Sequence, residues 1–122
     1  MTKRVYIIED DKRNLKLFIA IFKTMPDVEI YSEIRGDTGL ELIKSGNPDL
    51  IILDINLPVM NGIEIGRKLR KIEKFKNIPI IAVTSFAMRG DKERILAAGF
   101  NEYTSKPIRV SEFRKLVNKY LE

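Results

Sequence analysis

Short apolar runs alternate with amphipathic stretches along the whole chain. Runs such as Val5–Ile8 and Leu50–Leu53 are rich in β-branched residues, which is typical of strands buried on both faces of a parallel sheet. The stretches between them repeat apolar residues every three or four positions, as a helix with one buried face does. This pattern predicts strands at residues 4–9, 28–33, 49–54, 78–83 and 101–104, and helices at residues 12–25, 37–45, 62–73, 90–98 and 109–121.

The alternation predicts an α/β fold: a doubly wound, five-stranded parallel sheet with five helices. The expected strand order is 2-1-3-4-5, as in flavodoxin-like folds. A chain of 122 residues suits one domain covering residues 1–122, and no segment is left for an output domain. At the helix ends, Asp11 and Asp91 are expected as N-caps and Gly99 as the glycine that follows a helix.

Polar residues follow the strands, and Asp54 stands out because it comes directly after the most apolar run. A carboxylate beside a buried strand is costly unless it has a function. Glu9 and Asp10 follow the first strand, Thr84 follows the fourth, and Lys106 follows the fifth. Ligands of open parallel sheets bind outside the carboxyl ends of the strands, so these side chains are expected at one site.

The expected site has the chemistry of phosphoryl transfer. If the first and third strands are neighbours, Glu9, Asp10 and Asp54 converge, and a divalent cation would relieve their repulsion. Mg²⁺ fits best, since it prefers oxygen ligands and leaves positions for a phosphoryl oxygen. Asp54 can then act as a nucleophile, with the Lys106 ammonium and the Thr84 hydroxyl contacting the transferred group.

Composition narrows the chemistry further. The chain has no cysteine and no histidine, which excludes disulfides, thiolate or imidazole catalysis and the usual transition-metal sites. Its net charge of +5 comes from Lys and Arg spread along amphipathic helices, which favours solvated helix faces over a nucleic-acid site. The N-terminus begins a strand rather than a signal peptide or membrane span, so a cytoplasmic location without membrane insertion is expected.

These motifs together resemble the receiver domain of two-component response regulators over the whole chain. The resemblance rests on Glu9-Asp10, Leu53-Asp54 followed by Leu57-Pro58 and Met60-Asn61-Gly62, Val83-Thr84, and Lys106-Pro107. Within that family, Phe86-Ala87-Met88, Gly90-Asp91 and Ser105-Lys106-Pro107-Ile108 are similar to the DivK-type cell-division regulators. Three positions depart from the commoner residues: Glu9 replaces Asp, Ser85 replaces Ala, and Asn61 replaces Asp.

The resemblance implies a signalling protein rather than an enzyme acting on a separate substrate. Asp54 would accept a phosphoryl group from a histidine kinase or a histidine phosphotransfer protein. Mg²⁺, for which Mn²⁺ can substitute, would be held by Glu9, Asp10, Asp54 and the backbone carbonyl of Asn56. Lys106 would bind the phosphoryl group through a turn with a cis Lys106–Pro107 bond.

The resemblance also implies a switch made of Thr84 and Tyr103, read out at about residues 88–120 by a downstream protein. For the phosphodonor, a second apolar patch on the first helix is expected as a docking surface, beside the stripe that Leu15, Ile19 and Phe22 make. The residues assigned to this docking surface are Asn14, Leu17, Ile21, Pro107 and Ile108.

Three other functions fit the residues less well. A haloacid-dehalogenase-like phosphatase needs a second acid where Asn56 stands, and a cap for which the chain is too short. A flavodoxin-like FMN module needs a phosphate loop where Glu9, Asp10 and Asp11 would repel phosphate. A receiver domain that only binds partners would lack Asp54, Lys106 or the acidic pair, and all of these are present.

Overall fold

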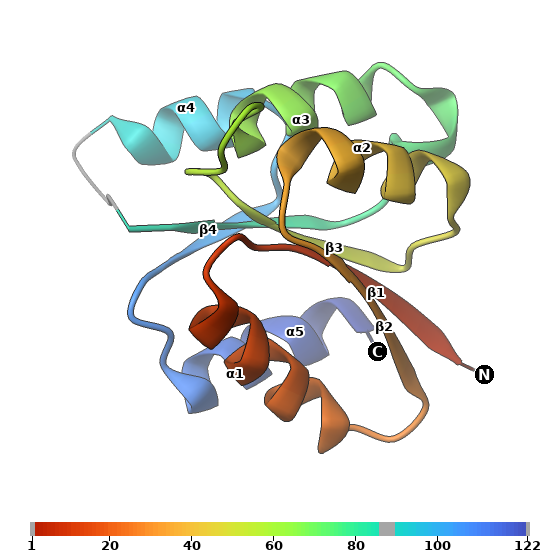
Figure 1. Cartoon of the computed structure of the whole chain (residues 1–122), viewed down its shortest axis with the longest axis vertical. Coiled ribbons are helices and arrows are strands. Elements are labelled where there is room, and N and C mark those ends of the chain that lie inside the picture. The colour runs from red at the N-terminus through yellow and green to blue at the C-terminus, as the bar shows by residue number, and fades with distance from the viewer. Residues whose placement is uncertain (1, 86–89, 122) are drawn as a thin grey trace.

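The computed structural model describes residues 2–85 and 90–121, which form one five-stranded parallel sheet between two layers of helices (Figure 1). The strands are β1 (Lys3–Ile8), β2 (Val28–Glu33), β3 (Leu50–Asp54), β4 (Ile80–Thr84) and β5 (Glu102–Ser105). The helices are α1 (Lys12–Lys23), α2 (Gly36–Ser45), α3 (Gly62–Arg70), α4 (Asp91–Ala97) and α5 (Val110–Leu121), with a short 3-10 helix η1 (Glu73–Phe75). The Phe86-Ala87-Met88 segment and residue 89 lie outside the described residues.

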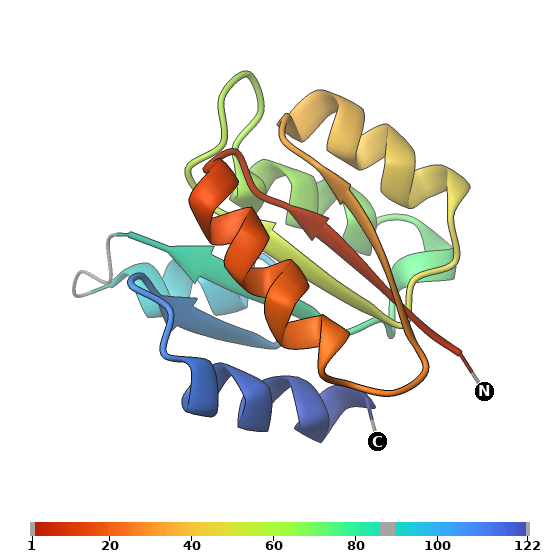
Figure 2. The ribbon, with the colours of Figure 1, turned by 60° about the horizontal axis from the view of Figure 1, so that its bottom comes forward.

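The strand order is β2-β1-β3-β4-β5, and all neighbouring strands are parallel, so the predicted fold class and order are confirmed. Helices α1 and α5 cover one face of the sheet, and α2, α3 and α4 cover the other (Figure 2). Because β1 and β3 are neighbours in the middle of the sheet, the loops that follow them meet at the same edge.

Each face of the sheet has its own hydrophobic core, because successive side chains of a strand point to opposite faces. On β3, Ile51 and Leu53 pack toward α2, α3 and α4, whereas Leu50 and Ile52 pack toward α1 and α5. All four side chains are fully buried. The continuous apolar run therefore reflects a strand covered on both sides. The predicted buried face of the last helix is confirmed. Helix α5 packs into the core on the α1 and α5 side of the sheet through Phe113, Leu116, Val117, Tyr120 and Leu121.

Two predicted helix ends are confirmed at Asp11 and Gly99, and other ends differ from the prediction by one to three residues. Asp11 caps α1 by accepting a hydrogen bond from the Arg13 amide, and Gly99 follows α4 with a φ of 103°. Asp91, predicted as the N-cap of α4, is its first helical residue, because Gly90 takes the cap position. Helix α3 ends at Arg70 rather than at residue 73.

Arg70, the last residue of α3, connects the end of this helix to neighbouring segments. Its guanidinium donates hydrogen bonds to oxygen atoms of η1, of the loop that follows η1 and of the loop before β5. The acceptors are Phe75 O at 2.6 Å, Ile78 O at 2.7 Å, Gly99 O at 2.8 Å, Lys76 O at 3.3 Å and Asn101 Oδ1 at 2.8 Å. Asn101 Oδ1 also accepts a hydrogen bond from the Ile80 amide at 2.8 Å. The Asn101 side chain, in the loop before β5, therefore connects Arg70 at the end of α3 to the start of β4.

We expect Arg70→Met to destabilise the fold by about 2–4 kcal/mol, because partly buried carbonyls lose charge-assisted hydrogen bonds. Arg70→Lys should recover only part of this loss, since an ammonium cannot reproduce the planar fork of a guanidinium. Urea unfolding followed by circular dichroism measures both variants. The matched control is Arg67→Met, an exposed position on the same helix, which should stay within about 0.5 kcal/mol of the wild type.

Candidate functional site

The residues expected to share a site do meet at the carboxyl edge of the sheet. Asp54 is the last residue of β3, and Glu9 and Asp10 follow β1, which is paired with β3. One carboxylate oxygen from each of these three residues lies within 4.8 Å of the others. Thr84 ends β4, the other neighbour of β3, and Lys106 follows β5.

Lys106 neutralises part of the buried negative charge. Its Nζ donates a hydrogen bond to Asp54 Oδ2 at 3.0 Å and a longer one to Glu9 Oε2 at 3.3 Å. Both carboxylates are 1% exposed, and the lysine side chain is 14% exposed. The Lys106–Pro107 bond is cis, as the resemblance implied.

Backbone amides hold the two buried carboxylates in place. The Asn56 amide donates to Asp54 Oδ1 at 3.0 Å, and the Asp11 amide donates to Glu9 Oε2 at 3.0 Å. Gly62, the first residue of α3, lies so close that a Cβ there would collide with the Asp54 carbonyl oxygen. The motif that ends in Gly62 thus packs the start of α3 directly against the site.

Glu9 and Asp54 have opposite pKa shifts. Burial, followed by a hydrogen bond to Asp54, raises the pKa of Glu9 to about 8. Burial also opposes ionisation of Asp54, but hydrogen bonds from Glu9, Lys106 and the Asn56 amide outweigh burial and lower the pKa of Asp54. At neutral pH and without a cation, Glu9 therefore holds a proton while Asp54 is ionised.

The pKa values of Asp10 and Lys106 are also shifted by burial and by Asp54. Burial, and then the hydrogen bond and charge of Asp54, raise the pKa of Asp10. For Lys106, burial disfavours the charged form, but the hydrogen bond and charge of Asp54 outweigh it and raise the pKa.

The acidic cluster fits a hard divalent cation. Its donor set consists of oxygen atoms, which Mg²⁺ and Mn²⁺ accept. Glu9 Oε1 is buried, and among the described residues it accepts no hydrogen bond, although Lys106 Nζ lies 3.2 Å away. A buried polar atom without a partner is costly. A proton on Glu9, which the raised pKa favours, or a cation bound between the carboxylates would satisfy it.

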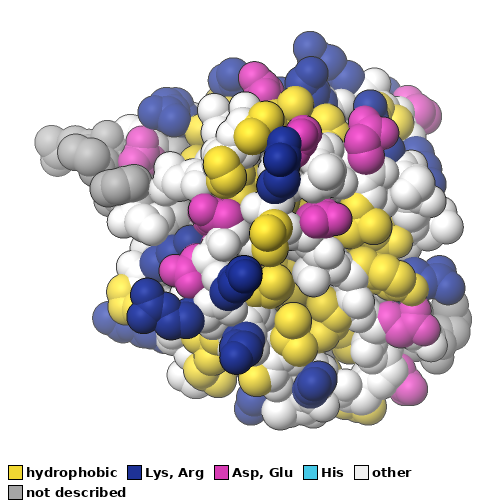
Figure 3. Space-filling view, in the orientation of Figure 1, with side chains coloured by type: hydrophobic (Ala, Val, Ile, Leu, Met, Phe, Trp, Pro, Cys, Tyr) yellow, Lys and Arg dark blue, Asp and Glu magenta, His cyan; other side chains and the backbone are white. Residues whose placement is uncertain are grey.

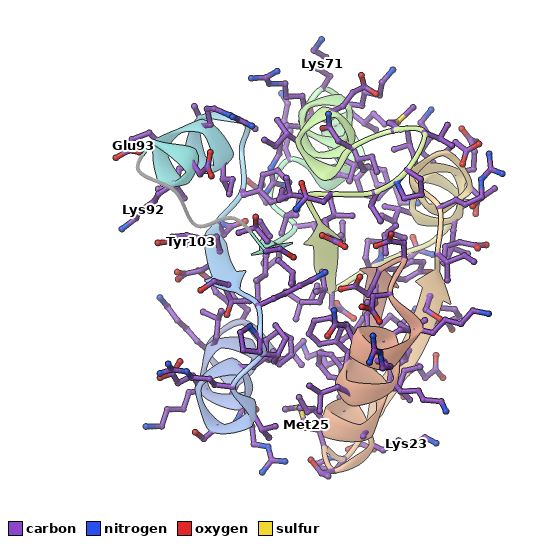
Figure 4. All side chains as sticks on the ribbon, turned by 60° about the vertical axis from the view of Figure 1, so that its left-hand side comes forward. Lys23, Met25, Lys71, Lys92, Glu93 and Tyr103 are labelled. Atoms are coloured by element: carbon purple, nitrogen blue, oxygen red, sulfur yellow. The ribbon has the colours of Figure 1, made fainter. Side chains whose placement is uncertain are left out.

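The residues assigned to a switch lie as expected along the strands. Thr84 is 2% exposed at the end of β4. Tyr103 is half-buried in β5 and packs against the core on the α2, α3 and α4 side of the sheet. Figure 4 shows Tyr103 at β5, below α4 in this view.

The prediction of an exposed second apolar patch on α1 is wrong at Ile21, which is only 3% exposed and packs in the core. Ile21 shares the buried face of α1 with Phe18 and Phe22. Ile108 is also buried, at 9% exposed. Of the assigned docking residues, Asn14 and Leu17 are half-buried and Pro107 is exposed.

A polar pocket of about 320 Å³ beside Lys106 was not predicted. It is lined by Thr104, Ser105, Lys106, Pro107, Arg109 and Glu112. Arg109 pairs with Glu112 at 3.5 Å, at the start of α5. Nothing in the local sequence separates Arg109 from other surface arginines.

Comparisons with known proteins agree with this geometry. The family model described as the response regulator receiver domain matches residues 5–118. The polar-differentiation response regulator DivK of Brucella ovis is 44% identical over 99% of this chain and 98% of its own length. Among the described residues, no helix is both long and apolar enough to span a membrane.

Solved receiver structures share the fold. The receiver domain of the sensor histidine kinase PA1611 from Pseudomonas aeruginosa PAO1 superposes with a TM-score of 0.88, at 27% identity and 98% coverage of both chains. That structure has a magnesium ion coordinated in its active-site cleft. The Mn²⁺-bound form of response regulator Rcp1 superposes with a TM-score of 0.81, at 26% identity, over 96% of this chain and 90% of that one.

The raised pKa of Glu9 makes stability depend on pH. The pKa of Glu9 is 4.5 in the unfolded chain and about 8 in the folded chain. Between these two pH values the folded chain keeps the Glu9 proton that the unfolded chain has lost. The free energy of unfolding therefore falls as pH rises through this window. Without metal, we expect a loss of roughly 2–4 kcal/mol between pH 5 and pH 8 from this group.

Urea midpoints in EDTA across this pH range measure the effect. Glu9→Gln should flatten the curve, because the amide does not titrate and remains uncharged at high pH. Mg²⁺ should reduce the wild-type decline, since a cation stabilises the ionised carboxylate. Equal slopes for the wild type and Glu9→Gln in EDTA would contradict the raised pKa.

Proposed function

The chain belongs to the response regulator receiver domain family, and we propose that Asp54 accepts a phosphoryl group from a phosphohistidine of a partner protein. One observation carries this assignment: Asp54 is buried, yet its pKa is lowered, and Lys106 Nζ lies 3.0 Å from Oδ2. An ionised carboxylate with a neighbouring ammonium is both a nucleophile and a place that tolerates additional negative charge.

In the transfer, an Asp54 oxygen forms a bond to phosphorus while the bond between phosphorus and the histidine nitrogen of the donor breaks. The electron pair of that bond stays with the imidazole. The Lys106 ammonium stabilises the phosphoryl oxygens, and the Asn56 amide holds the other Asp54 oxygen in place. Mg²⁺ or Mn²⁺, held by Glu9, Asp10, Asp54 and the Asn56 carbonyl, would neutralise charge on the transferred group.

We assign the response to phosphorylation to Thr84 and Tyr103. The Thr84 hydroxyl would move to hydrogen-bond a phosphoryl oxygen on Asp54, and Tyr103 would turn inward into the space that is vacated. Tyr103 is only partly packed against the core, which leaves it room to change position. The surface of α4, β5 and α5 then changes shape as a two-state element. Residues 88 and 89 of the expected readout face lie outside the described residues.

The proposed role is phosphorylation-dependent binding of a separate downstream protein in the cytoplasm, without binding of nucleic acid or insertion into a membrane. The near-complete coverage of DivK in both directions supports a role carried by the receiver domain itself. Its chemistry would be limited to its own phosphorylation and slow self-dephosphorylation. Leu17, Asn14 and Pro107 are proposed to contact the phosphodonor, a histidine kinase or a histidine phosphotransfer protein.

Phosphorylation of Asp54 can be tested with acetyl phosphate as a small donor and intact-mass measurement. With Mg²⁺, we expect the wild type to gain the mass of one phosphoryl group. Asp54→Asn, which keeps the size of the side chain but removes the nucleophile, should gain none. Labelling of the wild type should fall more than tenfold in excess EDTA. A phosphoryl group that appears on Asp54→Asn would disprove the assignment.

The switch can be tested with Thr84→Ala, which removes the hydroxyl from the site. We expect phosphorylation to remain within about threefold of the wild type, because Thr84 is not the nucleophile. Phosphorylation should then no longer shift the NMR signals of β5 and α5. Thr84→Ser, which keeps the hydroxyl, is the matched control and should retain these shifts. If Thr84→Ala responds like the wild type, the switch works through other residues.

A further inference from the structure

Cations concentrate at the end of α3 and in η1. Six of the 22 Lys and Arg residues of the chain fall within residues 67–76, and Glu73 is the single acid of that segment. We define the α3 patch as the four exposed residues Arg67, Lys68, Lys71 and Lys74. Figure 3 shows dark-blue side chains at the top of the view, where Figure 1 places α3. Figure 4 shows Lys71 at the top of its view, pointing away from α3.

Acids of the described residues do not balance the α3 patch. None of its four side chains takes part in the ion pairs that those residues form within 4.0 Å. The other two cations of the segment do have partners. Lys76 pairs with Glu73 at 2.8 Å, and the half-buried Arg70 donates hydrogen bonds to oxygen atoms of neighbouring loops. The charge of the patch is therefore directed to the surroundings of the protein.

Helix stability explains only part of this concentration. The negative end of a helix dipole favours cations in the last turn, and Arg70 already supplies one there. Arg67 and Lys71 stand four residues apart, a spacing at which like charges repel. The start of α1 is different, because its cations directly follow Asp10 and Asp11. Repulsion without local compensation often marks a functional position.

The α3 patch offers charge and little else. The exposed large apolar side chains of the described residues are Ile34, Val59, Leu96 and Val110, and none of them belongs to residues 62–78. Residues 67–76 include no Ser, Thr, Asn or Gln. Protein partners are held mainly by apolar anchors, and base edges are read mainly by hydrogen-bonding side chains. The patch therefore suits a partner that is recognised by its negative charge alone.

Two partners of that kind are a lipid surface and the phosphate backbone of a nucleic-acid duplex. Helices α2, α3 and α4 form one layer (Figure 1), and the α3 patch lies on the outside of this layer rather than on a helix that protrudes into a groove. Proteins held by the backbone of a duplex contact about six to ten phosphates, which is more than four cations can reach. A flat lipid surface can meet all four at once, so the geometry favours lipid.

Contact through α3 would leave the acidic site accessible. Helices α1 and α5 cover the other face of the sheet (Figure 2), and Asp54 lies at its carboxyl edge. A protein that rests on a membrane through α3 would therefore still present Asp54, Leu17 and Pro107 to a phosphodonor.

We propose that the α3 patch binds the anionic lipid headgroups of a membrane surface. The binding is electrostatic and reversible, with no segment inserted into the bilayer. Polybasic surfaces are attracted to anionic leaflets over about one Debye length, and without an apolar anchor such attraction enriches a protein at the surface rather than fixing it there. The patch would thus raise the local concentration of the regulator at the membrane.

The test compares two variants that lower the net charge by the same amount. The α3 variant is Arg67→Gln/Lys68→Gln/Lys71→Gln, which removes charge while keeping side chains that favour helices. The control variant makes the same change on α1 and α5, at three exposed positions on the other side of the sheet: Lys16→Gln/Lys23→Gln/Lys115→Gln.

The probes are vesicles of phosphatidylcholine alone and vesicles that contain equal parts of phosphatidylcholine and phosphatidylglycerol. Sedimentation of the vesicles measures the bound protein. Circular dichroism and labelling by acetyl phosphate should be the same for both variants as for the wild type, which separates loss of binding from loss of folding.

We expect the wild type to bind the anionic vesicles at about 20 mM salt and to lose most of this binding at about 300 mM, because salt screens exposed charges. Each cation near an anionic leaflet strengthens binding about fivefold, so the α3 variant should bind at least about tenfold more weakly. Lys71→Gln alone should weaken binding about fivefold. The control variant should stay within about threefold of the wild type. Vesicles of phosphatidylcholine alone should bind none of the proteins.

Failure of the wild type to bind anionic vesicles at low salt would overturn the inference. Equal losses in the α3 variant and the control variant would also overturn it, since binding would then follow net charge rather than the patch. Duplex DNA and polyglutamate serve as competing probes. If either binds the wild type more tightly than the vesicles do, and the α3 variant loses that binding, the patch serves a nucleic acid or an acidic protein and the inference is wrong.

Discussion

The structure depends most on the balance of charge at the carboxyl edge of the sheet. Three carboxyl groups share this edge, and two of them are almost fully buried. One lysine cannot neutralise three carboxylates, and in a region of low dielectric the excess charge is costly. The protein meets this constraint without metal by keeping a proton on Glu9, which leaves Asp54 ionised and paired with Lys106.

This balance would favour a bound divalent cation. Such a cation would be held by the same carboxylate oxygens that Lys106 contacts. In the proposed function it would supply charge that balances the carboxylates, while the Lys106 ammonium binds the phosphoryl group. The extra methylene of Glu9, compared with the Asp that is commoner in the family, reaches far enough to contact Lys106 directly.

The opposite edge of the sheet has a different role. There Arg70, the last residue of α3, donates hydrogen bonds to carbonyl oxygens of η1, of the loop before β4 and of the loop before β5. The two charged centres thus lie at opposite edges of the sheet. Arg70 lies at the edge where β4 and β5 begin, and Asp54 with Lys106 lies at the edge where the strands end. The proposed switch from Asp54 to β5 would act through a sheet whose other edge is held by the hydrogen bonds of Arg70.

Much of this molecule could be predicted from the order of its residues. Strand and helix positions follow from hydrophobic periodicity, and the meeting of Asp54, Glu9 and Lys106 follows from the rule that parallel strands end at one edge. Hydrophobic periodicity depends on the local sequence, and the strand-end rule depends on the order of the elements. Both can be applied without knowledge of side-chain packing. Three features were decided only by the tertiary structure: the burial of Ile21, the hydrogen bonds of Arg70 to distant segments, and the raised pKa of Glu9. Each depends on which groups from distant segments come into contact, and neither periodicity nor motif spacing contains that information.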